Sequence, residues 1–102
     1  MGRLFTRRVK NRVYNEIIDQ GFDPDIVWDL VDERVDENSI RAAAVESNDP
    51  AVRDFVEREY SRAGGGLLDR LIDFLKSPQG QLLIDIIVKA LVAALMALLA
   101  GS

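Results

Sequence analysis

The chain has 102 residues and a formal net charge of −4 at pH 7, with 13 lysine and arginine residues against 17 aspartate and glutamate residues. It contains no cysteine and no histidine, which excludes disulfides, thiolate metal sites, thiol nucleophiles and imidazole general bases. A chain of this length builds one small domain at most. The composition therefore argues against an enzyme, and it gives no indication of a metal ion or a cofactor.

Charge is distributed unevenly along the sequence. Residues 1–12 carry five basic side chains and no acidic one, residues 13–63 carry 14 acidic side chains against five arginines, and residues 64–102 carry three of each sign. The chain thus has a basic N-terminal head, an acidic body and a nearly neutral apolar tail. The residues of the basic head are Arg3, Arg7, Arg8, Lys10 and Arg12.

Hydrophobic residues recur at steps of three and four through the first 63 residues, which predicts helices. Gly21 lies where a left-handed cap would end the first helix, and Asp-Pro pairs at 23–24 and 49–50 provide an N-cap followed by proline at the first helical position. Ser39 is expected to cap the third helix. The expected helices are residues 4–20, 23–37, 39–45 and 49–63. No segment alternates with a period of two, so we predict an all-α protein.

Three consecutive glycines, Gly64 to Gly66, mark the clearest boundary, because glycine loses more backbone entropy on ordering than any other residue. We predict a hinge there, which separates a small helical domain formed by residues 1–63 from the C-terminal part. Residues 67–76 have an apolar face opposite a charged one, which is typical of an amphipathic helix that lies at a membrane interface. Residues 77–102 are expected to form one long apolar helix.

The segment from Pro78 to Ala100 contains only two charged residues, Asp85 and Lys89. As a helix it would be roughly 34 Å long, close to the roughly 30 Å thickness of the bilayer hydrocarbon. A charge at the bilayer centre costs about 2.5 to 3.5 kcal/mol. The two residues are four positions apart, however, so they share a helical face and can form an intramembrane polar pair. We therefore interpret residues 82–100 as a transmembrane anchor.

This membrane interpretation makes two further predictions. The segment after the basic head is amphipathic and does not resemble a signal peptide, so the N-terminus is expected to stay on the side of synthesis. A chain that ends at Lys76 is expected to be soluble and helical. The alternative interpretation is a helix buried at the centre of a soluble oligomer, because the uninterrupted apolar run from Ala90 to Ala100 is short for a membrane span.

Small residues recur along the tail at the spacing that lets two helix backbones approach closely. This pattern predicts self-association into a homo-oligomer, although alanine is also common in apolar helices that do not associate. The residues of this small-residue face are Ala90, Ala93, Ala94, Ala97 and Gly101.

The basic head is expected to bind an anionic surface, because a polybasic segment is attracted to phosphates of lipid or of nucleic acid. Anionic lipid is the preferred partner, since the tail would already hold the protein at a bilayer. The alternative is an intramolecular contact with an acidic stripe. That stripe lacks the turn glycine and closing glutamate of a calcium loop, so we expect it to be solvated rather than metal-bound. It consists of Asp25, Asp29, Asp32 and Asp36.

Together these features predict a non-enzymatic, membrane-anchored, oligomeric structural or adaptor protein. It would link a membrane to a protein or nucleic-acid assembly, as a membrane-associated virion component does. Two alternatives stay open. One is a holin-like pore former in which Asp85 and Lys89 line a lumen, and the other is a soluble structural subunit whose apolar tails form the centre of a bundle.

Overall fold

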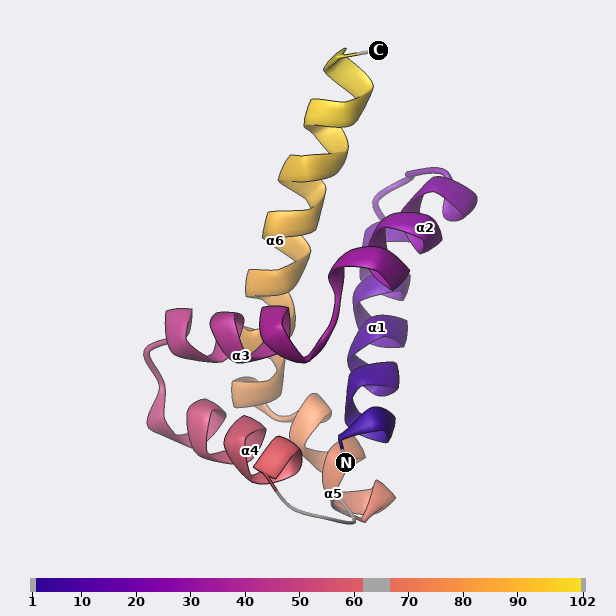
Figure 1. The fold of residues 1–102 in the computed structure, drawn as a ribbon. Helices are drawn as coiled ribbons and strands as arrows, with labels where there is room; N and C mark the ends of the chain where they lie inside the picture. Colours follow the sequence, from indigo (N-terminus) through magenta and orange to yellow (C-terminus); the bar gives the residue numbers. More distant parts are fainter. Residues whose placement is uncertain (1, 62–66, 102) are drawn as a thin grey trace.

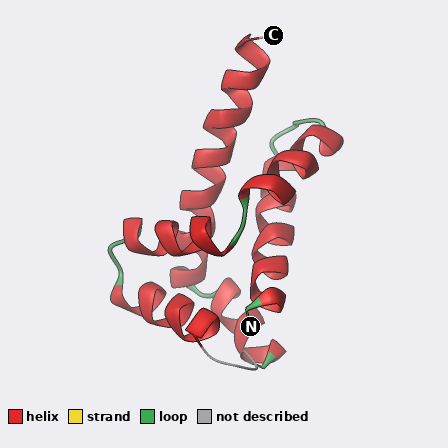
Figure 2. Ribbon diagram, in the orientation of Figure 1, coloured by secondary structure: helices red, strands yellow, loops and turns green. Residues whose placement is uncertain are grey.

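The computed structural model describes residues 2–61 and 67–101, and over these residues the chain is all-helical, as the sequence predicts (Figure 1). The described residues form six helices and no strand, and the described connections between helices are loops or turns (Figure 2). The predicted hinge at residues 64–66 lies outside the described residues. The helices are α1 (Arg3–Ile18), α2 (Pro24–Arg34), α3 (Glu37–Glu46), α4 (Pro50–Ser61), α5 (Leu68–Lys76) and α6 (Pro78–Gly101).

The second helix ends at Arg34 rather than at the predicted residue 37, because the N-cap of the third helix is Asp36 and not Ser39. Val35 is extended, and Asp36 is the N-cap of α3. The Asp36 carboxylate accepts a hydrogen bond from the Ser39 N–H at 2.8 Å, and the Ser39 hydroxyl accepts one from the Asp36 N–H at 2.9 Å. Ser39 is therefore the reciprocal partner in a capping box rather than the cap itself.

Helix α6 is the central element of the fold, because it contacts each of the other five helices of the described chain. Its buried face joins a single hydrophobic cluster with the buried residues of α1 to α5. The large side chains that α6 contributes to this core are Leu83, Ile84, Ile87, Val88, Leu91 and Leu95. The apolar tail is therefore part of the domain core as far as Leu95.

A tight corner joins α5 to the start of α6. The Ser77 hydroxyl accepts the Gly80 N–H at 3.1 Å and donates to the Phe74 carbonyl at 2.5 Å. A Cβ atom on Gly80 would lie 1.9 Å from the Phe74 carbonyl oxygen, so only glycine fits at this position. The apolar face of α5, with Leu71 and Leu75, is buried in the same core, so this amphipathic helix packs on the domain.

The last turns of α6 extend past its last buried residue, Leu95. Residues from Met96 to Gly101 are all exposed, whereas Leu95 is 1% exposed. In Figure 1 this yellow end of α6 projects beyond the body of the molecule, and the N-terminus of α1 lies toward the opposite end, near α4 and α5. The molecule is elongated, with extents of 42 × 24 × 21 Å.

The burial of α6 reverses the expectation for truncation. A chain that ends at Lys76 loses the six buried α6 side chains, each of which stabilises by about 1.5 to 3 kcal/mol. Their sum is comparable with the whole stability of a small domain, about 5 to 15 kcal/mol. We predict that this chain is not stably folded, whereas a chain that ends at Met96 keeps the core. Urea titration followed by circular dichroism measures both, and a cooperative transition in the shorter chain would contradict the central role of α6.

Candidate functional site at the two ends of the molecule

Helix α6 is the one helix among the described residues that is long and apolar enough to cross a membrane. In its most apolar 18-residue window, 33% of the residues are buried inside the domain. The exposed remainder includes Met96 and Leu98, both 55% exposed. The apolar surface that is free in this structure is thus the end of the helix and one stripe along it, not the whole predicted span.

The uncharged part of α6 matches one leaflet rather than a whole bilayer. Lys89 is the last charged side chain, and the run from Ala90 to Gly101 is about 18 Å long at 1.5 Å per residue. Half of a roughly 30 Å hydrocarbon layer is about 15 Å. Leu91 and Leu95 of this run are buried in the core, so the part that can enter a leaflet with the domain intact is residues 96–101, about 9 Å long. Asp85 and Lys89 then stay outside the hydrocarbon.

Asp85 and Lys89 are both exposed on α6. Asp85 accepts a hydrogen bond from the Gln81 side-chain amide at 2.7 Å. None of the ion pairs within residues 2–61 and 67–101 joins Asp85 to Lys89. Their role as an intramembrane polar pair stays a prediction.

The small-residue face of α6 is exposed except at Ala94, which packs against the edge of the core. Ala90, Ala93, Ala97 and Gly101 are exposed and Ala94 is half-buried. This face is therefore open to a partner helix, although self-association through it stays a prediction.

Two of the five cations of the basic head form ion pairs within the chain. The Lys10 ammonium pairs with the Asp32 carboxylate at 2.9 Å, which joins α1 to α2. Arg12 pairs with Glu16 at 3.0 Å and donates to the Leu75 carbonyl at 2.8 Å, which joins α1 to α5. The intramolecular alternative for the head thus applies to Lys10, through one aspartate of the acidic stripe.

The remaining cations, Arg3, Arg7 and Arg8, take part in none of the ion pairs of the described chain. Arg3 and Arg7 are exposed and Arg8 is half-buried. The first turn of α1 contains no acidic residue, and its N-cap, Gly2, supplies no side-chain acceptor. The positive end of the helix dipole therefore adds to the three arginines and favours anions at this end.

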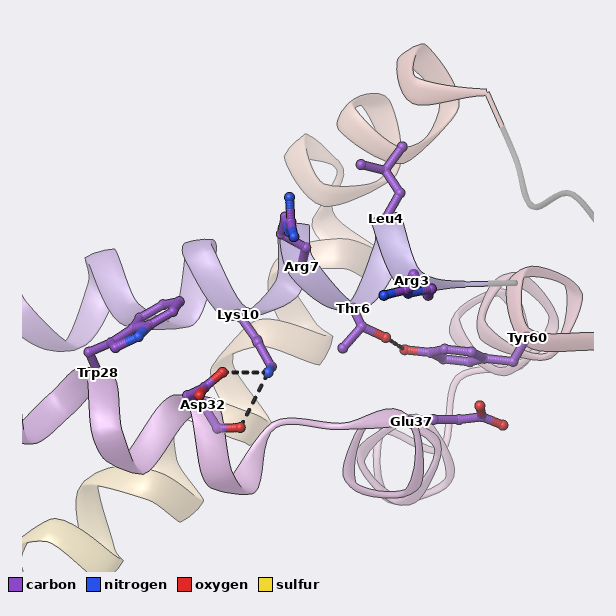
Figure 3. A pocket seen from close by; sticks show the side chains of 9 residues that line it. All are labelled: Arg3, Leu4, Thr6, Arg7, Lys10, Trp28, Asp32, Glu37 and Tyr60. Atoms are coloured by element: carbon purple, nitrogen blue, oxygen red, sulfur yellow. Dashed lines mark hydrogen bonds and ion pairs between the residues drawn. The ribbon is translucent and has the colours of Figure 1, made fainter.

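Arg3 and Arg7 line an open cleft of about 680 Å³ between α1, α2, α3 and α4 (Figure 3). The acidic residues that line it, Asp32 and Glu37, are already paired with cations of α1 and α3. The charge left free in the cleft is therefore positive. The sequence did not predict this cleft.

Three aromatic side chains, Trp28, Phe55 and Tyr60, contact other side chains of the domain. Trp28 meets Tyr14 edge-on with ring centroids 5.4 Å apart, and Phe55 stacks on Phe74 at 3.9 Å. The Tyr60 hydroxyl lies 2.6 Å from the Thr6 hydroxyl (Figure 3). Burial raises the pKa of Tyr60 to about 12.

The acidic stripe is divided among separate tasks. Asp32 pairs with Lys10, Asp36 caps α3, and Asp25 and Asp29 are exposed. Across the two described ranges there is no group of three or more histidine, cysteine, aspartate or glutamate residues placed to hold a metal ion.

Comparison of the chain with protein-family models, with curated proteins and with solved structures gives no match.

The raised pKa of Tyr60 leads to a prediction about pH. The group is neutral when protonated, and its pKa is higher in the folded state than the usual value of 10.0. The stability it contributes is therefore complete below pH 10 and is lost as the pH rises toward 12. In a Tyr14→Phe variant, Tyr60 is the remaining tyrosine of the two in the chain. We expect its phenolate absorbance to appear with a midpoint at about pH 12 in folded protein and at about pH 10 in urea. A folded midpoint near 10 would show that the hydroxyl is solvated.

Proposed function

We propose that the protein is a non-enzymatic, membrane-anchored adaptor. The free end of α6 enters one leaflet of a bilayer, while the helical domain and its basic N-terminal end remain in water. The observation that supports this proposal is the projection of an uncharged apolar helix end, exposed from Met96 to Gly101, away from a domain with its own core.

Insertion of the exposed end of α6, residues 96–101, is preferred to a full span because it leaves the buried face of the helix in the domain core. A span over residues 82–100 would draw the buried side chains of α6, from Leu83 to Leu95, out of the core. Those side chains would stay dry in lipid, but the apolar faces of the helices that pack on them would be exposed to water. That exposure has a free-energy cost proportional to the apolar area.

The basic end faces away from the bilayer in this arrangement, which supports an adaptor role. In Figure 1 the free end of α6 and the N-terminus lie toward opposite ends of the molecule. The turn between α1 and α2, nearer the free end of α6, carries Asp19 and Asp23. Arg3, Arg7 and Arg8 would then meet an anionic partner other than the anchoring bilayer, and nucleic acid fits their chemistry because arginine binds phosphates well.

The anchor is tested by a charge placed on the free end of α6. Full-length protein is expected to float with neutral lipid vesicles, and Leu98→Asp to lower the bound fraction by at least about tenfold, because a carboxylate is costly within hydrocarbon. Val45→Asp is the matched control, since Val45 is 63% exposed but lies on α3. Vesicle flotation measures all three proteins. If Leu98→Asp floats as well as the parent protein, the end of α6 is not the anchor.

The adaptor role is tested at the other end of the molecule. We expect the triple variant Arg3→Glu, Arg7→Glu, Arg8→Glu to bind duplex DNA more weakly and with a shallower salt dependence, while its flotation with neutral vesicles is unchanged. A control of equal charge reverses Arg34, Arg53 and Arg58, which are exposed on α2 and α4. Equal losses in both triple variants would show that only net charge matters. A loss of vesicle binding in the first variant alone would place the basic end against the bilayer instead.

A further inference from the structure

One stripe of α6 is uncovered from the base of the helix to its free end. Leu82 is 37% exposed, Ile86 is half-buried, and Ala90, Ala93 and Ala97 are exposed. At 100° per residue these five positions share one face of the helix. The stripe is apolar, and the described helices cover it only in part: Ile86 packs against the edge of the core, and Ile86 and Ala90 border a hollow next to α3.

Two opposite charges border this stripe on the same flank. Asp85 and Lys89 are four residues apart, and Lys89 takes part in no ion pair within the described chain. Exposed charges of opposite sign at the border of an apolar stripe can pair with a second copy of the same surface. Whether they do so depends on the direction in which the two helices run.

Symmetry decides which direction makes the charges complementary. When two copies of a helix pair antiparallel about a two-fold axis, the same flank of each lies on the same side of the interface. With the axis beside residue 87, Asp85 faces the partner's Lys89 and Lys89 faces the partner's Asp85. In a parallel pair the two charged flanks lie on opposite sides of the interface and cannot meet.

In the same register the overlap of the two α6 helices reaches the start of the exposed end, and residues 97–101 extend past the partner's Pro78. Met96 of each copy lies opposite the partner's Pro78, so about 19 residues overlap over about 28 Å. The free end then lies beside the base of the partner's α6. A hollow of about 370 Å³, lined in part by Phe55, Phe74 and Gln79, occupies that region of the chain.

We propose that, in water, two copies of the chain pair antiparallel along their α6 stripes, with two reciprocal ion pairs between Asp85 and Lys89. This goes beyond the membrane role, because it describes the state of the protein away from a bilayer. The partner is a second copy of this chain, and the pair covers apolar surface that a soluble monomer would expose.

Charge exchange tests the proposed contact. Asp85→Lys and Lys89→Asp each place like charges opposite each other in their own pair, so each alone should dimerise at least about tenfold more weakly than the parent. A mixture of the two should form a heterodimer, and the double variant Asp85→Lys, Lys89→Asp should pair like the parent. Sedimentation equilibrium measures association, and circular dichroism verifies folding. Single variants that dimerise like the parent would overturn the proposal, as would a parent chain that is monomeric or dissolves only in detergent.

Engineered cysteines test the direction, because the chain has none of its own. In the antiparallel pair two copies of residue 82 lie about 15 Å apart along the axis, beyond the reach of a disulfide. Leu82→Cys alone should therefore not cross-link, whereas a mixture of Leu82→Cys and Ala93→Cys should, because residue 82 lies opposite residues 92 and 93 of the partner. Efficient cross-linking of Leu82→Cys to itself would establish a parallel pair. Vesicle flotation is a separate measurement, so failure of the anchor and failure of the pairing are distinguishable.

Discussion

The burial of one face of α6 determines where every other feature of this molecule lies. Ile84, Leu91 and the other buried side chains of the helix form a common core with α1 to α5. An α-helix satisfies its own backbone hydrogen bonds, so α6 continues as a rigid rod after its last buried residue, Leu95. The packing of α6 up to Leu95 therefore sets the direction of the exposed residues that follow it. The same packing places the start of α1, with its exposed arginines, toward the end of the molecule opposite the apolar end of α6 (Figure 1).

Polar contacts at the base of α6 explain why the basic head does not act as one surface. Arg12 donates to the Gln81 side chain, and the Gln81 amide donates to Glu16 at 3.2 Å and to Asp85 at 2.7 Å. This chain of contacts fastens α1 to the first turns of α6, while Lys10 fastens α1 to α2. Hydrogen bonds to charged groups stabilise by about 1.5 to 3 kcal/mol when they are shielded from water, which makes Arg12 a structural residue. The cations that remain for an external anion are those of the first two turns.

The sequence predicted the helices well, since hydrophobic periodicity and the Asp-Pro starts depend on neighbouring residues. It predicted the role of α6 less well. Leucine and alanine surround that helix on nearly all sides, so its composition did not reveal which face is buried, and length alone favoured a membrane span. The available signal was the pair Asp85 and Lys89, which marks the exposed face together with Leu82 and Ala93. The division of the basic head into paired and unpaired cations could not be read from spacing, because Lys10 shares one flank of α1 with Arg3 and Arg7, and Arg12 shares the other with Arg8. Their partners are set by tertiary packing.

The exposed surface of α6 can be buried either against a second copy of the chain or in a bilayer, and the two states exclude each other. An antiparallel pair points its two free ends in opposite directions, so both cannot enter the same bilayer, and the end of each helix lies against its partner. A chain that inserts must therefore leave its pair. The balance follows mass action: pairing is favoured by a high protein concentration in water, and insertion by a large accessible lipid area. Asp85 and Lys89 strengthen this exclusion, because they are satisfied by a partner in the pair and by water in the inserted state, where they lie outside the hydrocarbon. Pairing in water and insertion into lipid are therefore alternative states of one molecule, since the exposed residues from Met96 to Gly101 can enter lipid once the pair dissociates.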